Sequence, residues 1–299
     1  MFGLYFLPAL LGLGFLIADS NDSDDAPETV PEDELREIPE EEGARVELLD
    51  AETFYVGSDF GVEVIANDND SELLPLGGND TVVALGGDDS INGGADDDAI
   101  YAGDGQDEVF GGEGDDRLFL GAGDDVSSYA TRDAPALNAG DDFIRGGGGD
   151  DQIFDQYGSN TMFGDTGDDS LVALDGLTGD GSLDPGADFG SADTLDGGVG
   201  NDFISGDDGD EMTGGTGEDE FEVVSNASRT ETAVQITDFD TDEDALTIFT
   251  NDDENSAVDF TFDAGKGGVV ADIDGVEVAV LQGLVAADIP DIQVALRFY

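Results

Sequence analysis

Aspartates recur every nine residues through the middle of this chain. The clearest repeat is residues 111–119, where glycines lead to an acidic pair and one apolar residue follows two places after the second acid. Glycines can adopt positive φ and turn their carbonyl oxygens toward a common point, and the carboxylates beside them add charged oxygens. Such oxygens are the ligands that hard cations, above all calcium, prefer. Because calcium needs about six of them, we expect two successive loops to share each ion.

The predicted metal ligands stand at fixed places in each repeat: the acid at the sixth place and glycines at the first, second and fourth. The acids are Asp80, Asp89, Asp98, Asp107, Asp116, Asp125, Asp142, Asp151, Asp169, Asp193, Asp202 and Asp219. The glycines are Gly87, Gly105, Gly112, Gly114, Gly123, Gly147, Gly149, Gly167, Gly198, Gly200 and Gly217. Acids that served only solubility would not need a nine-residue period, so the spacing favours ligation.

Two repeats carry a different residue at the sixth place. Asn160 keeps an oxygen but loses the charge, and Glu211 moves its carboxylate by one methylene. We therefore expect weaker metal sites at both. Ser127 and Thr213 stand where the apolar residue belongs. They should be weak points of the core.

The glycine–aspartate nonapeptide with an apolar eighth place resembles the calcium-binding repeats of the repeats-in-toxin (RTX) family. The resemblance covers residues 77–222, with apolar residues such as Val82, Ile91, Ile100, Val109 and Leu118 on the same period. It implies an all-β fold, a right-handed parallel β-roll (a β-helix solenoid). Each repeat would form half a coil, with six residues of loop and three of strand whose apolar member points inward.

In such a roll, alternate repeats lie on the same side. We expect Asp80, Asp98 and Asp116 on one side and the repeats between them on the other. A short, degenerate repeat at residues 131–135 should then move Asp142 to the second side and return Asp151 and Asp169 to the first. Residues 173–189 break the period, and we interpret them as a surface loop, with a further calcium site there as the open alternative.

Composition narrows the possible partners and chemistry. The 299 residues include 74 Asp and Glu against 8 Lys and Arg, a formal net charge of -66, which excludes nucleic acid and anionic membranes as partners. The absence of Cys and His removes the usual ligands of zinc, copper, haem and iron–sulfur clusters, as well as Cys nucleophiles and Ser–His triads. Calcium is the expected cofactor, and we expect no enzymatic activity.

The N-terminal part divides into three predicted segments. Residues 1–18 are apolar and are interpreted as a hydrophobic export signal or anchor, although no basic residue precedes them; a helix that packs on protein is the alternative. Residues 19–43 are acidic and contain prolines, which predicts a disordered tether. Residues 44–76 hold short β-like runs at 53–56 and 62–65, as expected of an N-terminal β cap of the roll.

Residues 223–299 alternate apolar and polar residues in several runs, which predicts a C-terminal, β-sandwich-like cap. Asp274–Gly275 between two such runs predicts a hairpin over residues 268–281. Residues 236–248 are similar to the segment that follows the repeats in many RTX proteins. This resemblance implies an uncleaved secretion signal for one-step export, while a cap without an export role remains the alternative.

The sequence predicts a secreted or surface-tethered calcium-binding protein whose roll folds on extracellular calcium. Two alternatives stay open: a calcium-dependent enzyme acting on polysaccharides, and an adhesin or surface-layer component. Besides calcium, the partners left open are an export machinery, a cell surface and a polysaccharide. Contact with a membrane is expected only through residues 1–18, and the expected location is extracellular, with anchoring at the cell surface left open.

Overall fold

The computed structural model describes residues 43–49, 53–127, 140–155, 158–174, 191–225, 232–250 and 256–298. All of them belong to the second of the two units into which the chain divides, Pro39–Tyr299. The predicted export signal or anchor at 1–18, nearly all of the tether at 19–43 and the degenerate repeat at 131–135 lie outside them. In this described part, no helix is long and apolar enough to cross a membrane.

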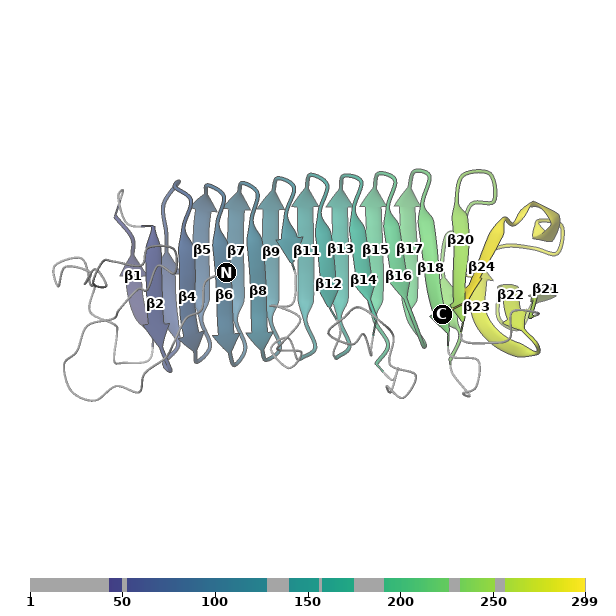
Figure 1. The fold of residues 1–299 in the computed structure, drawn as a ribbon, viewed down its shortest axis with the longest axis horizontal. Helices are drawn as coiled ribbons and strands as arrows, with labels where there is room; N and C mark the ends of the chain where they lie inside the picture. The colour runs from purple at the N-terminus through teal and green to yellow at the C-terminus, as the bar shows by residue number, and fades with distance from the viewer. Residues whose placement is uncertain are drawn as a thin grey trace, which may run out of the picture. The chain divides into compact units, whose positions relative to one another are not determined.

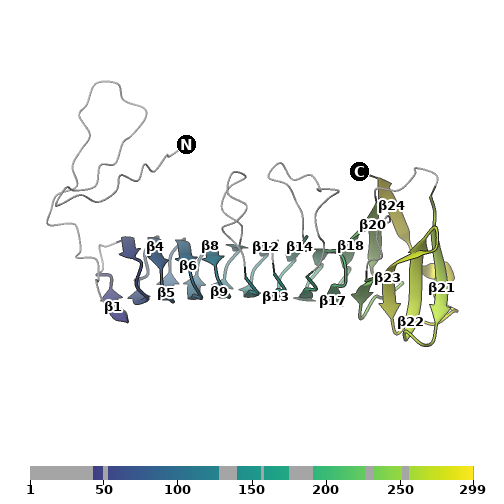
Figure 2. The same ribbon diagram turned by 90° about the horizontal axis from the view of Figure 1, so that it is seen from below.

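The described strands form two sheets, which the chain supplies in alternation (Figure 1). Each strand from β1 to β18 pairs in parallel with the strand two places later. Turned by 90°, the roll shows the two sheets as two layers (Figure 2). This arrangement is the predicted all-β parallel β-roll.

The first sheet contains β1 (Ala44–Glu47), β3 (Val62–Ile65), β5 (Thr81–Gly86), β7 (Ala99–Asp104), β9 (Arg117–Ala122), β11 (Phe143–Gly148), β13 (Thr161–Thr166), β15 (Thr194–Val199), β17 (Glu211–Thr216), β19 (Val234–Ile236), β23 (Val276–Gln282), β22 (Gly268–Ile273) and β21 (Val258–Asp263), in that spatial order. The second contains β2 (Phe54–Ser58), β4 (Glu72–Gly77), β6 (Ser90–Ala95), β8 (Glu108–Glu113), β10 (Val126–Ser127), β12 (Gln152–Asp155), β14 (Ser170–Ala173), β16 (Phe203–Gly206), β18 (Glu220–Ser225), β20 (Ala245–Thr250) and β24 (Val294–Phe298). A 3₁₀ turn, η1 (Ile289–Asp291), precedes β24.

The core between the sheets is one large apolar side chain deep in most half coils. The eighth-place residues point inward and are at most 2% exposed: Val82, Ile91, Ile100, Val109, Leu118, Ile144, Ile153, Met162, Leu171, Leu195, Ile204, Met212 and Phe221. Ser127 occupies the same inward place and is 3% exposed, as the sequence predicted. With so little apolar surface in each coil, the backbone ladders and the two edges must contribute much of the stability.

Parallel pairing runs beyond the repeats at both ends. At the N-terminal end, β1 and β2 already pair with β3 and β4 in the register of the roll. At the C-terminal end, β21, β22 and β23 form an antiparallel meander on the first sheet, and β24 pairs in parallel with β20 on the second. The predicted hairpin is confirmed as β22 and β23, joined by Asp274 and Gly275 at φ 53° and 88°.

An aromatic row lies on the outer face of the first sheet. Tyr101 and Phe119 stack with ring centroids 4.9 Å apart, and Phe143 and Phe163 continue the row at 5.7 Å spacings. These rings come from four neighbouring strands, so they add side-chain contacts along the direction in which the coils stack.

Candidate metal centre

The sixth-place residues lie along the two edges of the roll, where the chain passes between the sheets. Edge A carries the loops that lead from the second sheet to the first, and edge B carries the loops that lead back. The edge A ladder is Asp80, Asp98, Asp116, Asp142, Asn160, Asp193 and Asp210. The edge B ladder is Asp89, Asp107, Asp125, Asp151, Asp169, Asp202 and Asp219.

One hydrogen bond repeats along each ladder. The backbone N–H of Asp98 donates to Oδ1 of Asp116 at 2.8 Å, and the same bond joins each ladder residue to the one in the next coil. At the C-terminal end of edge B, Asp219 N–H donates to Oδ1 of Asp244 at 3.1 Å. Sequence reasoning missed Asp244, because it lies outside the glycine-rich repeats. The repeated bond fixes each carboxylate beside the next loop.

The predicted sides of Asp142, Asp151 and Asp169 were wrong. Asp116 N–H donates to Oδ1 of Asp142 at 2.8 Å, so Asp142 continues edge A, and Asp151 follows Asp125 on edge B. The reason is that β10 already supplies a strand of the second sheet. The next described strand, β11, lies in the first sheet, so Asp142 stands where the chain returns to that sheet along edge A.

The predicted register around Glu211 was also wrong. Asp210 is fully buried and accepts the N–H of Asp193 at 2.8 Å, whereas Glu211 is exposed. The step between these two ladder residues is 17 residues instead of the usual 18. The same shift turns Met212, not Thr213, into the core. The apolar residue two places after Asp210 was the sequence signal that identifies this register.

The ladder side chains are buried, with at most 4% of their surface exposed. In nine of the ladder aspartates, the second carboxylate oxygen has no hydrogen-bond partner. The Oδ2 atoms in question belong to Asp80, Asp89, Asp98, Asp107, Asp116, Asp125, Asp151, Asp169 and Asp202. Burial raises the pKa of Asp98 to about 8 and that of Asp116 to about 7, against the backbone N–H bonds that lower both. Carboxylates one coil away raise these pKa values further. The ladders therefore hold desolvated, mutually repelling oxygens that a cation would neutralise.

Four segments of the chain that carry these ladders match the model of a known family. Residues 76–109, 100–126, 138–171 and 189–221 match the family model of the RTX calcium-binding nonapeptide repeat. These segments are RTX calcium-binding repeats. None of the curated proteins compared with the chain matches it. RTX nonapeptide repeats bind Ca²⁺, so calcium is the cofactor of this roll, and secretion, including type I secretion, is typical of the family.

The glycines of the RTX repeats shape a donor set that fits calcium. Every glycine predicted as a ligand has φ between +107° and +154°. A Cβ at Gly105 would overlap the carbonyl oxygen of Gly87, one coil earlier, and a Cβ at Gly111 would overlap Oδ2 of Asp116. Carbonyl and carboxylate oxygens thus approach one another where only glycine fits. The role of each individual residue as a ligand remains a prediction.

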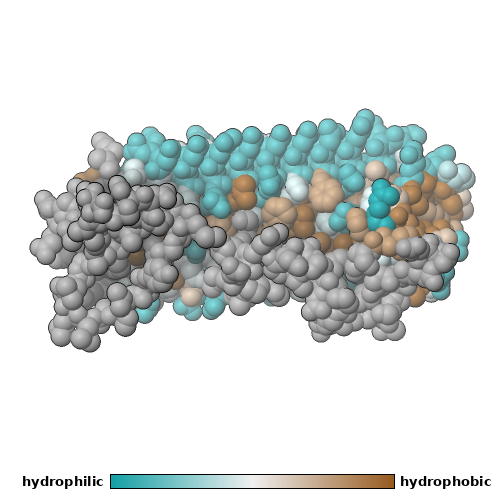
Figure 3. Space-filling view, in the orientation of Figure 1, coloured by the Kyte–Doolittle hydropathy of each residue, from teal (hydrophilic) through white to brown (hydrophobic). Residues whose placement is uncertain are grey.

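A calcium ion on these ladders must draw on more than acidic side chains. Within the described residues, no three acidic side chains gather around a single point. Backbone carbonyls and the carboxylates of two successive coils would have to complete its coordination. Bound there, the ion would supply positive charge to the buried oxygens and tie neighbouring coils together. Figure 3 shows hydrophilic residues along the loops of edge B and hydrophobic residues on the sheet face below them.

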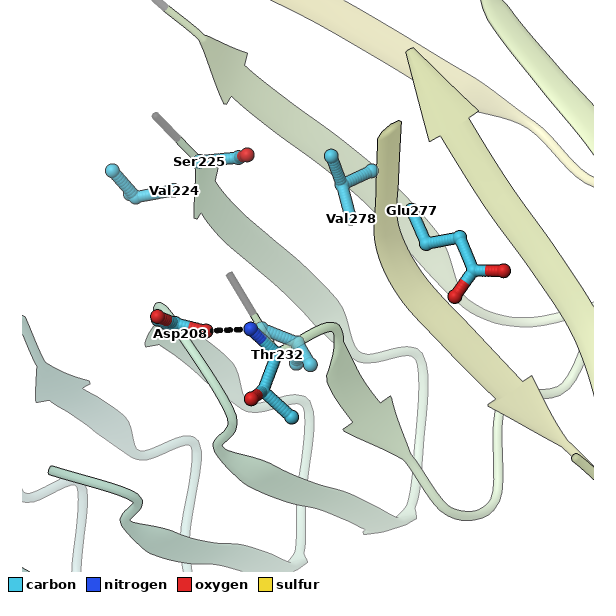
Figure 4. Close-up of a pocket in the computed structure, with 7 residues that line it drawn as sticks. Asp208, Val224, Ser225, Thr232, Glu277 and Val278 are labelled. Carbon is cyan, nitrogen blue, oxygen red and sulfur yellow. Dashed lines mark hydrogen bonds between the residues drawn. The ribbon is translucent and has the colours of Figure 1, made fainter. Parts of the chain in front are cut away.

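A small pocket lies where β18, β19 and β23 meet, lined in part by Asp208 and Glu277 (Figure 4). Asp208 accepts the backbone N–H of Thr232, and Glu277 forms an ion pair with Lys266. Much of the remaining lining is valine. Both carboxylates are thus engaged in contacts that hold strands together, and the pocket does not favour the enzymatic alternative.

Proposed function

We propose that this protein is a secreted or surface-tethered calcium-binding protein whose RTX roll folds on meeting extracellular calcium. One observation carries the proposal: nine buried ladder aspartates each keep an oxygen without a partner. A desolvated carboxylate without a compensating partner costs several kcal/mol, unless it takes up a proton or a cation. At neutral pH and with calcium available, the cation is the better partner.

The expected stabilisation is large enough to decide folding. With a dissociation constant of about 10⁻⁴ M, typical of extracellular modules, about 1 mM calcium stabilises each site by roughly 1.4 kcal/mol. About seven such sites, one for each interval between successive members of these nine aspartates, would contribute roughly 10 kcal/mol, within the range of about 5 to 15 kcal/mol for the whole stability of a domain. The thin core offers little to replace this term, so the roll should stay unfolded where calcium is scarce.

The test is a calcium titration of the full-length chain followed by far-UV circular dichroism and hydrodynamic radius. Calcium should convert an expanded chain into a compact, β-rich one. Magnesium is the control, and it should act poorly because it demands a tighter octahedral site and gives up its water reluctantly. An equal radius in calcium and in chelator would contradict the proposal.

Export belongs to the same proposal, and the secretion typical of RTX proteins supports it. Deletion of residues 230–299 should block secretion, because the C-terminal segment is proposed to carry the signal. Deletion of residues 1–18 should alter only anchoring at the cell surface. Measuring both variants in medium, membrane and cell fractions separates the two roles, and loss of secretion in the second variant alone would reverse the assignment.

A further inference from the structure

The outer face of the first sheet carries a patch without net charge. This sheet is the lower layer of the roll in Figure 2. Each of its six strands from β5 to β15 has three outward places, in register with Thr81, Val83 and Leu85 of β5. Of these eighteen places, only four are charged: Arg117, Arg145, Asp165 and Asp196. Their charges cancel, in a chain whose formal net charge is -66.

The patch holds an arginine that no acid of the described chain neutralises. Arg145 pairs with Asp165, and Arg45 and Lys266 pair with glutamates. Arg117 is exposed, yet within the described residues its guanidinium has no hydrogen bond or ion pair. The chain has 74 acidic residues that could have supplied a partner. Arg117 therefore stays available to a group outside the chain.

Arginines and phenylalanines alternate on the two central strands of the patch. β9 carries Arg117 and, two places later, Phe119. β11 carries the same two residue types in the opposite order, Phe143 and then Arg145. In the register of the sheet, Arg117 lies beside Phe143, and Phe119 lies beside Arg145. A two-fold axis that runs parallel to the strands and midway between them therefore exchanges a guanidinium for a ring in both rows.

Such an axis would bring the faces of two copies together with complementary groups opposite each other. Each residue of β9 would face, in the second copy, its own register neighbour from β11. Arg117 would lie on Phe143 of the second copy, and Arg145 would lie on Phe119 of the second copy. A guanidinium over an aromatic ring is attracted to it, and more strongly where water is excluded. The patch is thus self-complementary, as an interface with two-fold symmetry requires.

The residues around the axis fit the same pairing. One strand further out, Tyr101 of β7 would face Phe163 of β13 in the second copy, which adds a pair of rings. In the third row, Gly121 would meet Gly147 of the second copy. No side chain therefore holds the centres of the two faces apart.

Charge restricts two copies to this placement. An axis through β9 would set Arg117 against Arg117 of the second copy, and an axis through β11 would do the same with Arg145. Like charges that face each other across an interface oppose association. The formal net charge of -66 also makes two copies repel each other as a whole. The neutral patch is where they can approach.

The patch has the area of a modest interface. Its strands are six residues long, and six of them about 4.8 Å apart give a face of roughly 580 Å². Two such faces would bury roughly 1,150 Å², just above the roughly 1,000 Å² that a specific interface needs. Because the copies repel each other at long range, the dimer should dissociate at micromolar concentrations and tighten as salt screens the repulsion.

We infer that the outer face of the first sheet binds a second copy of this chain, in a dimer whose two-fold axis runs parallel to the strands between β9 and β11. Only the folded roll presents this face, so the dimer forms after folding. The inference does not depend on which oxygens hold calcium.

Sedimentation equilibrium of the full-length chain in calcium tests the inference. Phe143→Lys sets a lysine against Arg117 of the second copy and should raise the dissociation constant of the dimer at least about tenfold. Arg117→Glu combined with Phe143→Lys sets a glutamate against that lysine and should return the constant to within about threefold of the parent value. The matched control is Phe110→Lys, which alters an outward ring of β8 on the second sheet and should leave the constant unchanged.

A cross-link guards against variants that fail to fold. Ala99 of β7 and Thr161 of β13 stand in the same row, three strand spacings or about 14 Å apart within one copy. In the dimer, each would face the other residue of the second copy. The chain has no cysteine, so Ala99→Cys with Thr161→Cys introduces the only thiols. A thiol cross-linker shorter than about 14 Å should join this double variant into covalent dimers and should not join either single variant.

The outcomes separate the inference from the proposed function. A roll that folds in calcium but stays monomeric up to about 0.1 mM would overturn the inference and leave the proposed function intact. Equal weakening by Phe143→Lys and Phe110→Lys would also overturn it, as would equal cross-linking of the single and double cysteine variants. If Phe143→Lys does not fold, the cross-links decide. A chain that is folded and dimeric in chelator would support the inference and contradict the proposed function.

Discussion

Replacing Asp98 by Asn should change calcium-free and calcium-bound folding in opposite directions. At pH 7 the unfolded chain keeps Asp98 ionised, since its unperturbed pKa is 3.8, but the calcium-free roll raises this pKa to about 8 and favours the protonated form. The difference of roughly three pKa units between 3.8 and pH 7 corresponds to about 4 kcal/mol. Asn removes this cost but buries an amide N–H₂ in place of Oδ2, which takes back about 1 to 3 kcal/mol.

The net effect in chelator should therefore be a stabilisation of roughly 1 to 3 kcal/mol. In calcium the sign reverses, because the carboxylate of Asp98 faces the loops of Asp80 and Asp116 and its loss weakens the ions on both sides. Calcium-induced folding, followed by circular dichroism at fixed ionic strength, should show a dependence on calcium lower by up to about two ions. The control is Asp104→Asn, which removes an exposed charge from the same roll.

An unchanged calcium dependence for Asp98→Asn, or a larger effect of Asp104→Asn, would refute the reasoning. The first result would mean that the ladder carboxylate does not face an ion. The second would mean that net charge, and not the nine-residue register, controls folding.

Three further predictions follow from the same contacts. In chelator, burial raises the folded-state pKa values of ladder aspartates such as Asp80, Asp98 and Asp107 from 3.8 to about 6 to 8. The stability that these carboxyl groups contribute should therefore be present below about pH 4 and lost as the pH rises through 6 to 8. Circular dichroism measured against pH would show this loss. Met212→Ala should lower the free energy of unfolding, measured with urea in the presence of calcium, by about 2 to 5 kcal/mol, and Thr213→Ala should lower it by distinctly less. A larger loss for Thr213→Ala would support the register that the sequence predicted, with Thr213 in the core. Gly111→Ala should raise the calcium midpoint because its Cβ would overlap Oδ2 of Asp116, whereas Gly77→Ala, with 3.7 Å to the nearest atom, should leave it unchanged.

The nine-residue period predicted the roll because every repeat needs its glycines, its acid and its inward apolar residue at the same places. Asp116 and Leu118 could be assigned from sequence since a nine-residue period gives each place a single environment. The period no longer predicts the place of a residue after an insertion, as at Asp142, or after a deletion, as at Asp210. Seventeen residues between Asp125 and Asp142 fit either one short repeat or one long connection, and only the pairing of β10 with β8 and β12 decides between them.

Asp155 is a different kind of failure, because it is fully buried at the first place of its repeat, where Gly111 stands in the repeat of Asp116. In a chain with 74 acidic residues, an acid at a glycine position is expected to lie in solvent, and no local pattern distinguishes it from the others. Its burial depends on the parallel register of β12 with β14, in which Asp155 pairs with Ala173 of the next coil. Such contacts between coils depend on how the coils stack, so they cannot be predicted from the sequence of a single repeat.

Between β10 and β15, two connections of edge A are longer than a repeat loop, and the ladder of that edge crosses both of them. A calcium site needs its carbonyl donors at fixed places before the acid, so an insertion there disrupts the coordination of the ion. A ladder hydrogen bond needs only that the acid itself lies beside the next coil, and the bond from Asp116 to Asp142 keeps its 2.8 Å length across 26 residues of chain. The hydrogen bonds of edge A can therefore hold the coils in register across an insertion. On edge B every connection from β5 to β18 is three residues long and has glycine at the fourth place of its repeat, so an insertion there should remove ions as well as lengthen a loop.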